Sequence, residues 1–408
     1  MTRLPATFSG KMDTAAKALL VAAAFALALP TAWVSVFLIP LGFCWLLSGR
    51  FRYKYQRIRE NPAAWMPIVL FALYGIGVLY SSAEQAQALD YFAKYHKLLY
   101  IPIAVSFLDD ATWRRRALDA FLVGMLLVLA ISYLKWMGLY PHVDIGQGYY
   151  AFKGRIVHSI FMAFAVYLFL ERAFRPGKWR WAWAVLVILA LFNLFVLVNG
   201  RSGQVAVVAI LVWFFLERLG WRAALAVVIL VPALLWVWSE SPWGEHVRLF
   251  GIASEIPSAE GQHPGSAGQR IQFIETTFTL VAEHPILGGG TGSIANEYRR
   301  YALQHGYEPS LTNVTNPHNE YLLTAQHLGL VGLAVLLYMG WLQWRAGGEI
   351  GGSDGHGLRA LVIVIGVGSL FNSLLLDAGE GKFYCMLAGI FLSAWRPDMR
   401  SLIVARAP

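Results

Sequence analysis

Residues 313–336 read NVTNPHNEYLLTAQHLGLVGLAVL, and in this stretch a long polar segment changes into an apolar run of membrane-spanning length. Asn316 belongs to the residue types that favour a helix N-cap, and Pro317 suits the first helical position. We therefore predict a helix that carries His318 and Asn319 in its opening turn. This arrangement places a titratable imidazole at a membrane surface, although a histidine that only caps its own turn is the alternative.

Small residues follow His318 along one side of the predicted helix. At about 100° per residue, Ala325, Gly329 and Gly332 project close to the direction of His318. A stripe of small residues on a membrane helix lets a neighbouring helix approach closely. We therefore expect His318 to face the protein interior and not lipid.

The composition is that of a membrane protein. The 408 residues are 57% hydrophobic and 14% charged, and the mean hydropathy is +0.53, which excludes an ordinary soluble globular protein. About twelve apolar stretches approach the length of a membrane span. They centre on Ala23, Ile39, Ala72, Ala104, Leu126, Ala163, Leu189, Ile210, Val228, Val335, Ile365 and Leu387. The predicted fold is an all-α polytopic membrane protein with about twelve transmembrane helices and one large periplasmic loop.

The spans divide the chain into three predicted parts. Residues 1–238 hold the first nine transmembrane helices, residues 239–317 form the extramembrane loop, and residues 318–408 hold the last three. The start of the loop lacks periodicity, whereas residues 268–285 read as an amphipathic helix with Ile271, Ile274 and Phe278 on one face. A glycine-rich turn at residues 286–294 then leads into a second short helix. Its backbone amides form a weak candidate anion cradle, and a plain helix stop and start is the simpler interpretation.

The positive charge follows the predicted topology. With both termini cytoplasmic, most of the Lys and Arg residues lie on the inner side of the membrane, as the positive-inside rule requires. The net charge of +9 therefore indicates contact with membrane lipids and needs no nucleic acid. Cys44 and Cys385 lie inside apolar runs without metal-ligand spacing, so we interpret them as small buried hydrophobic residues.

A few basic residues on the outer side oppose this bias. Arg155 and Arg201 lie where predicted spans begin, Lys97 lies near the outer surface, and Lys382 lies in the last outer turn. The hairpin around Arg201 is short, and Gly203 in it permits close backbone approach, so Arg201 is well placed to bind phosphate. Contact with lipid headgroups is the alternative for each of these cations.

Three segments together resemble a known family. They are LVNGRSGQVA at residues 197–206, VAEHPILGGGTGSI at residues 281–294 and NPHNEYLLTAQHLGLVGL at residues 316–333. These segments are similar to the O-antigen ligase and polymerase superfamily of bacterial envelope glycosyltransferases. Within it the chain looks most like the ligase that moves a polysaccharide from undecaprenyl diphosphate to the lipid A core. Polymerases and protein O-oligosaccharyltransferases are neighbouring members and remain alternatives.

The resemblance implies a bacterial inner-membrane enzyme whose active site faces the periplasm. It implies that a histidine opening the span after the loop, an arginine at an earlier span boundary and an arginine in the loop are essential. These positions fall on His318, Arg201 and Arg270. The partners implied are an undecaprenyl-diphosphate-linked glycan as donor and the lipid A core as acceptor.

The residue types suit glycosyl transfer from a lipid diphosphate. Two arginines match the oxygens of a departing diphosphate, and a histidine deprotonates the incoming hydroxyl, so direct attack inverts the anomeric carbon. An imidazolium at His318 that binds the diphosphate is the alternative. Further substrate-binding candidates are Arg155, Lys97, Lys382 and Asn319.

We expect neither a metal nor another cofactor, because no D-x-D motif or His/Asp/Cys cluster occurs on the outer side. A flippase for lipid-linked sugar is the rival from another class. The position of the charged residues toward span ends disfavours it.

Overall fold

The computed structural model is helical throughout its described part, which covers residues 6–141, 148–198, 200–239, 266–307 and 311–396. Within those ranges there is no β-strand. The helices are α1 (Ala6–Ala26), α2 (Thr31–Leu47), α3 (Phe51–Arg59), α4 (Pro62–Leu79), α5 (Gln85–Lys94), 3-10 helix η1 (Tyr95–Leu99), α6 (Tyr100–Phe107), α7 (Ala111–Trp136), α8 (Arg155–Phe174), α9 (Arg180–Phe192), π-helix η2 (Asn193–Leu197), α10 (Arg201–Leu219), α11 (Trp221–Ser239), α12 (Ser266–Glu283), α13 (Ile294–His305), α14 (Glu320–Ile350), α15 (Gly352–Gly368) and α16 (Ala378–Leu392).

Six helical segments of the described chain are long and apolar enough to cross a membrane: α4, α7, α8, α9 with η2, α10 and α14. Helices α2 and α3 pass the same test only as a pair, and they are bent by 112° at their junction. Every one of the twelve predicted stretches centres in a helix, but several of these helices, such as the eight-residue α6, are too short. The polytopic helical fold is confirmed, whereas the number twelve stays a prediction.

Helix α16 forms the centre of the molecule. All its residues from Gly379 to Leu392 are buried, and it packs against α6, α8 and α15. Aromatic rings fill the contact with α8, where the centroids of Phe161 and Phe383 lie 4.2 Å apart. The segment that leads into α16, residues 369–377, is therefore held between the surrounding helices.

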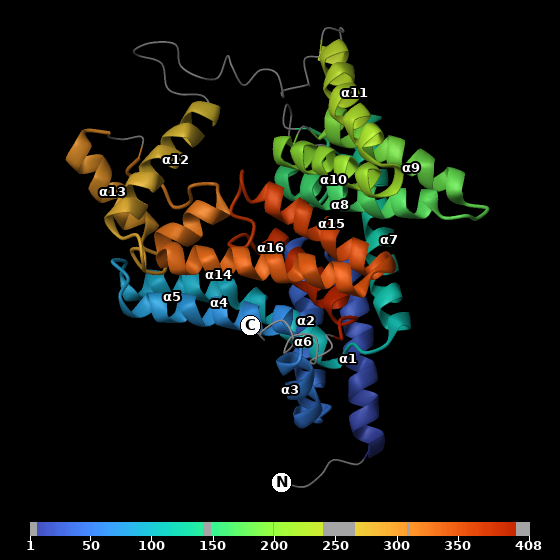
Figure 1. Cartoon of the computed structure of the whole chain (residues 1–408), viewed down its shortest axis with the longest axis horizontal. Helices are drawn as coiled ribbons and strands as arrows, with labels where there is room; N and C mark the ends of the chain where they lie inside the picture. Colours follow the sequence, from blue (N-terminus) through green and yellow to red (C-terminus); the bar gives the residue numbers. More distant parts are fainter. Residues whose placement is uncertain (1–5, 142–147, 199, 240–265, 308–310, 397–408) are drawn as a thin grey trace, which may run out of the picture.

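Helix α14 lies alongside α4 and is broken near its start (Figure 1). Gly329 has φ 63° and ψ −164°, outside the helical region. The loop at residues 285–290 fills the break: Gly289 N–H donates to Gln326 O at 2.8 Å, and Leu330 N–H donates to Pro285 O at 2.8 Å. A non-helical backbone at membrane depth is tolerated because protein groups complete its hydrogen bonds.

This break corrects the predicted stripe of small residues. A Cβ atom at Gly329 would lie 2.2 Å from the backbone of Ile286, so the close approach is real. The approaching element is the loop at residues 285–290, and not a neighbouring membrane helix. His318 precedes the helix and therefore does not lie on the stripe.

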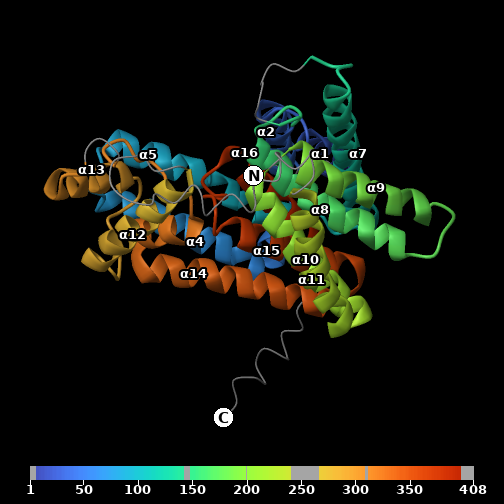
Figure 2. The ribbon, with the colours of Figure 1, turned by 90° about the horizontal axis from the view of Figure 1, so that it is seen from above.

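Helices α12 and α13 lie together at the end of the molecule that also holds α5, far from α9 (Figure 2). They confirm the two short helices that the sequence predicts between residues 239 and 317. The start of the predicted loop, residues 240–265, lies outside the described residues. The division of the chain into three parts stays a prediction.

Candidate functional site

His318 lies in a tight turn directly before α14. Asn319 is the N-cap: its Oδ1 accepts the N–H of Leu322 at 3.0 Å, and its Nδ2 donates to Leu370 O at 3.1 Å. The prediction of Asn316 as the N-cap is wrong, because Asn316 Oδ1 instead accepts the N–H of His318 at 2.8 Å. The side chain of Asn319 thus has a structural function, and its contact with substrate stays a prediction.

The backbone of His318 is strained. Its φ of 55° lies in the left-handed region, which residues other than glycine adopt at a cost of roughly 1–2 kcal/mol. Such strain persists only where surrounding contacts impose it, and it concentrates at functional sites. The strained conformation directs the His318 side chain out of the helix and toward α12.

Helix α12 supplies one side of the His318 environment. The rings of Phe273 and His318 stack at 27° with centroids 6.3 Å apart, while the imidazole remains exposed at this surface. Arg270 lies one helical turn before Phe273. Partial desolvation first, and the charge of Arg270 second, lower the pKa of His318 below its ordinary 6.5. The imidazole is therefore predominantly neutral at neutral pH.

Residues 369–377 connect the turn of His318 to the start of α10. Ser373 Oγ donates to Asn316 Oδ1 at 2.6 Å, and Asn372 Nδ2 donates to Ser202 Oγ at 2.6 Å. Both Asn372 and Ser373 are buried. Because Ser202 is the neighbour of Arg201, two adjacent side chains of one segment brace the elements that carry His318 and Arg201.

Glu320 also holds the segment 369–377 in place. Its Oε2 accepts the backbone N–H groups of Leu375 at 2.8 Å and Leu376 at 3.3 Å, and its side chain is buried. Lys97 Nζ completes the bracing, since it donates to Leu376 O at 2.8 Å and Asp377 O at 2.7 Å. The turn before α14 therefore has little freedom to shift relative to α16.

Arg201 is the first residue of α10, and Arg155 is the first residue of α8. The two helix starts are in close contact: a Cβ atom at Gly203 would lie 2.4 Å from Ser159 Cβ, which confirms the predicted close approach. A helix N-terminus favours anions, and a guanidinium at the same place adds positive charge. This end of the α8 and α10 pair thus suits a phosphate-bearing ligand.

The candidate lysines Lys97 and Lys382 lie apart from Arg155 and Arg201, in a pocket that contains neither arginine. Lys97 and Lys382 are 3% and 8% exposed, and Lys382 Nζ donates to Ser35 Oγ at 2.7 Å. Both line one pocket that Asn316 also reaches. The two lysines therefore lie beside the turn of His318, whereas Arg155 and Arg201 lie at two helix starts that contact each other.

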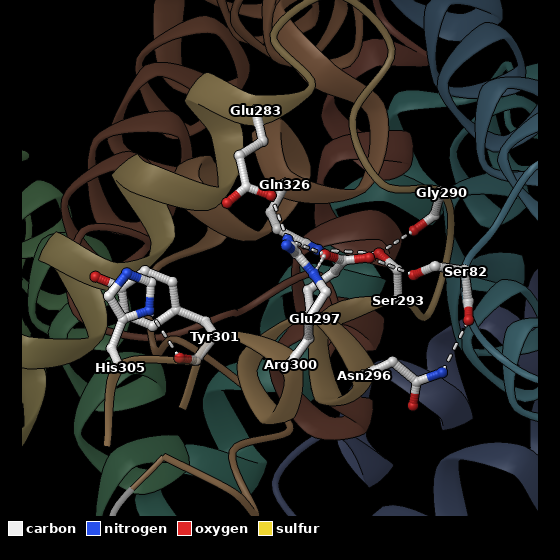
Figure 3. A network of polar contacts seen from close by, with 10 residues as sticks. All are labelled: Ser82, Glu283, Gly290, Ser293, Asn296, Glu297, Arg300, Tyr301, His305 and Gln326. Carbon is white, nitrogen blue, oxygen red and sulfur yellow. Dashed lines mark hydrogen bonds and ion pairs between the residues drawn. The ribbon is translucent and has the colours of Figure 1, made fainter. Parts of the chain in front are cut away.

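A polar network holds α12 and α13 against the rest of the protein (Figure 3). Arg300 forms ion pairs with Glu283 of α12 and, at 2.8 Å, with Glu297. Glu297 accepts the hydroxyl of Ser82 at 2.6 Å, and Gln326 of α14 donates to Ser293 Oγ at 2.9 Å. These contacts fix the helix that carries Arg270 relative to the helix that follows His318.

The glycine-rich turn does not form an anion cradle. The N–H groups of Gly289, Gly290 and Thr291 donate to the carbonyls of Gln326, His327 and Gly77 at 2.8, 3.0 and 3.0 Å. These amides are used within the protein. The simpler interpretation, a plain helix stop and start, holds.

Two features escaped the sequence analysis. The first is the segment 369–377, which braces the site. Its polar residues lie between two apolar runs, and this pattern could have indicated it. The other is a buried network in which Asn193 of η2 contacts His158 Nε2 at 2.9 Å and Ser132 Oγ at 2.6 Å. Among the residues that the structure describes, no group of three or more His, Cys, Asp or Glu could hold a metal ion.

Comparison with known protein families identifies a match in this chain. Residues 184–337 match the family model described as O-antigen ligase, which supports membership of the O-antigen ligase and polymerase superfamily. The matched region runs from α9 into α14 and contains Arg201, Arg270 and His318. No curated protein matches the chain.

Proposed function

We propose that this chain, a member of the O-antigen ligase and polymerase superfamily, transfers a glycan from undecaprenyl diphosphate to a sugar hydroxyl of the lipid A core. The family suggests a membrane glycosyltransferase, and the apolar helices agree with a membrane enzyme. The proposal places the reaction at the periplasmic face of the inner membrane, where Arg201, Arg270 and His318 carry it.

The two arginines bind the diphosphate of the donor. Arginine remains charged at all relevant pH values, and its planar fork matches two phosphate oxygens at once. Negative charge grows on the diphosphate as the sugar–oxygen bond breaks, so positive groups fixed before the reaction stabilise the transition state by several kcal/mol. Arg201 acts from the start of α10 and Arg270 from α12.

His318 accepts the proton of the acceptor hydroxyl. The hydroxyl oxygen attacks the anomeric carbon, the bond from that carbon to the phosphate oxygen breaks, and the electron pair leaves with the undecaprenyl diphosphate. The proton moves to the imidazole, which the lowered pKa keeps neutral and able to accept it. With no enzyme nucleophile and no metal in the step, the anomeric configuration inverts.

The observation that carries the proposal is the stacking of the His318 ring on Phe273, which lies one helical turn after Arg270 on α12. Residues three positions apart lie on one side of a helix, so a substrate that contacts His318 also lies near Arg270. The bracing of Asn316 and Ser202 by consecutive residues adds Arg201 to the same neighbourhood. These contacts support a single site whose residues, from Arg201 to His318, are up to 117 positions apart in the sequence.

The test is transfer by purified protein reconstituted with the lipid-linked donor. His318→Ala should abolish transfer while the protein remains folded. His305→Ala is the matched control, because His305 is an exposed residue at the end of α13, where its Nδ1 contacts Tyr301 O at 2.9 Å and its ring stacks on Tyr301. Transfer by His318→Ala at the rate of the control variant would refute the assignment of the base.

The acceptor is tested separately. The reconstituted protein receives one donor together with lipid A core, lipid-linked glycan or pilin-like protein. Product on the lipid A core alone supports the ligase, and product on either other acceptor indicates a polymerase or a protein O-oligosaccharyltransferase. Movement of the donor across the bilayer without a new glycosidic bond would indicate a flippase and refute the enzyme.

A further inference from the structure

A pocket of about 400 Å³ lies beside the turn of His318. Its walls come from the α5–η1 junction, from the segment before α14 and from the start of α16. Asn316 belongs to this wall, and the same side chain accepts the N–H of His318. The pocket therefore adjoins the proposed site but is lined by residues outside it.

Three lysines line this lysine pocket, which we define by Lys94, Lys97, Lys382, Asn316 and Asp377. Asp377 is its only acidic lining residue among the described residues, so the lining carries more positive than negative charge. The three lysines lie on the predicted outer side, where the positive-inside rule does not account for them. Their clustering in a hollow calls for a local explanation.

The buried lysines make no direct ion pair within the described part of the chain. Lys97 Nζ contacts two carbonyl oxygens and Lys382 Nζ contacts one hydroxyl, while the carboxylates of Glu320, Asp377 and Glu380 attract Lys97 from beyond ion-pair distance. An ammonium group has three donors, so each retains donor capacity. A buried charge without a directly paired counter-charge is costly, and a bound anion offsets that cost.

Lys94 completes the pocket at its open side. Its side chain is 43% exposed, its Nζ pairs with Asp90 at 2.8 Å, and it lies 4.4 Å above the ring of Tyr91. The ring limits the positions that this long side chain adopts. Lys94 therefore adds a partly exposed ammonium, paired with Asp90, to the lining of the pocket.

We propose that the lysine pocket binds a negatively charged group, a phosphate or carboxylate, on the sugars of the acceptor. This inference rests on the proposed function. The diphosphate is the obligatory anion of the donor and is assigned to Arg201 and Arg270, so a second anion next to the base belongs to the acceptor. Occupation of the pocket positions the acceptor hydroxyl near His318 and favours charged over uncharged glycan acceptors.

The test compares one acceptor glycolipid prepared with and without phosphate groups on its sugars. Lys382→Ala should raise the KM for the phosphorylated acceptor about tenfold and leave the KM for the donor unchanged. The Lys382→Ala variant should have similar KM values for the two acceptors, because it lacks the lysine that contacts the phosphate. Lys94→Ala should act in the same direction with a smaller effect. Lys135→Ala is the matched control, since Lys135 lies outside the pocket and contacts Tyr150 O.

Three outcomes overturn the inference. An equal effect of Lys382→Ala on both acceptors would make the lysine structural, and a raised KM for the donor would assign the pocket to the diphosphate. Direct binding of the phosphorylated acceptor to the His318→Ala protein provides a readout without transfer. Lost binding in the additional Lys382→Ala variant supports the pocket even if the assigned reaction fails, and unchanged binding refutes it.

Discussion

Replacement of Gly329 by alanine tests the break in α14. Alanine at φ 63° and ψ −164° costs roughly 1–3 kcal/mol from the backbone conformation alone, because this region is essentially restricted to glycine. Its Cβ would also lie 2.2 Å from the carbonyl carbon and oxygen of Ile286, which are backbone atoms and cannot rotate away. The loop at residues 285–290 must therefore move away from the helix.

Moving the loop breaks buried hydrogen bonds. Four of them cross the break: Gly289 N–H to Gln326 O, Gly290 N–H to His327 O, Leu330 N–H to Pro285 O and Val331 N–H to Ile286 O, at 2.8, 3.0, 2.8 and 3.3 Å. A buried polar group left without a partner costs about 1–3 kcal/mol. With two bonds lost, the variant should be less stable by about 3–9 kcal/mol.

The assay is thermal unfolding of the detergent-solubilised protein. The fraction of protein that stays monodisperse is measured at each temperature, and its midpoint is compared between variants. Gly340→Ala is the matched control in the same helix, because nothing lies within 4 Å of its added Cβ. That variant should be neutral or more stable by about 0.5–1 kcal/mol. Equal midpoints for the two variants would show that the loop does not complete the broken helix.

Further predictions concern the reaction. Since burial and Arg270 lower the pKa of His318 below 6.5, a general base predicts a rate that rises with pH, with its midpoint below 6.5, and then stays constant. A rate that falls through that pKa would instead identify an imidazolium. Arg201→Lys should reduce transfer roughly 10- to 100-fold, because an ammonium cannot reproduce the bidentate fork, whereas Arg299→Lys, at an exposed position of α13, serves as the control. Transfer rates should be the same before and after prolonged chelation of divalent cations, and loss of activity restored by one cation would contradict the metal-free step.

Local patterns were sufficient to predict most of the helices. Each apolar run became a helix, and the short helices α12 and α13 appear where periodicity indicated them. The buried face of α12 differs from the predicted one, because Phe278 is 60% exposed while Thr277 is buried. Thr277 Oγ1 contacts the hydroxyl of Tyr298 at 2.6 Å, so a polar pair, and not the aliphatic stripe, attaches α12 to α13.

The start of α14 shows why local rules failed at the site. Asn316 and Asn319 are both good capping residues, and sequence alone favoured the one followed by proline. The choice was decided by Leu370 and Ser373, which contact Asn319 and Asn316 from more than fifty residues away. Residue types therefore indicated the chemistry of the site, but its geometry depends on contacts that no local pattern encodes.

The loop at residues 285–290 and the first turns of α14 are hydrogen-bonded to each other across the break at Gly329. They consequently form one unit, and the turn of His318 at its start is held by the segment 369–377. In the proposed reaction the imidazole is therefore oriented before either substrate binds.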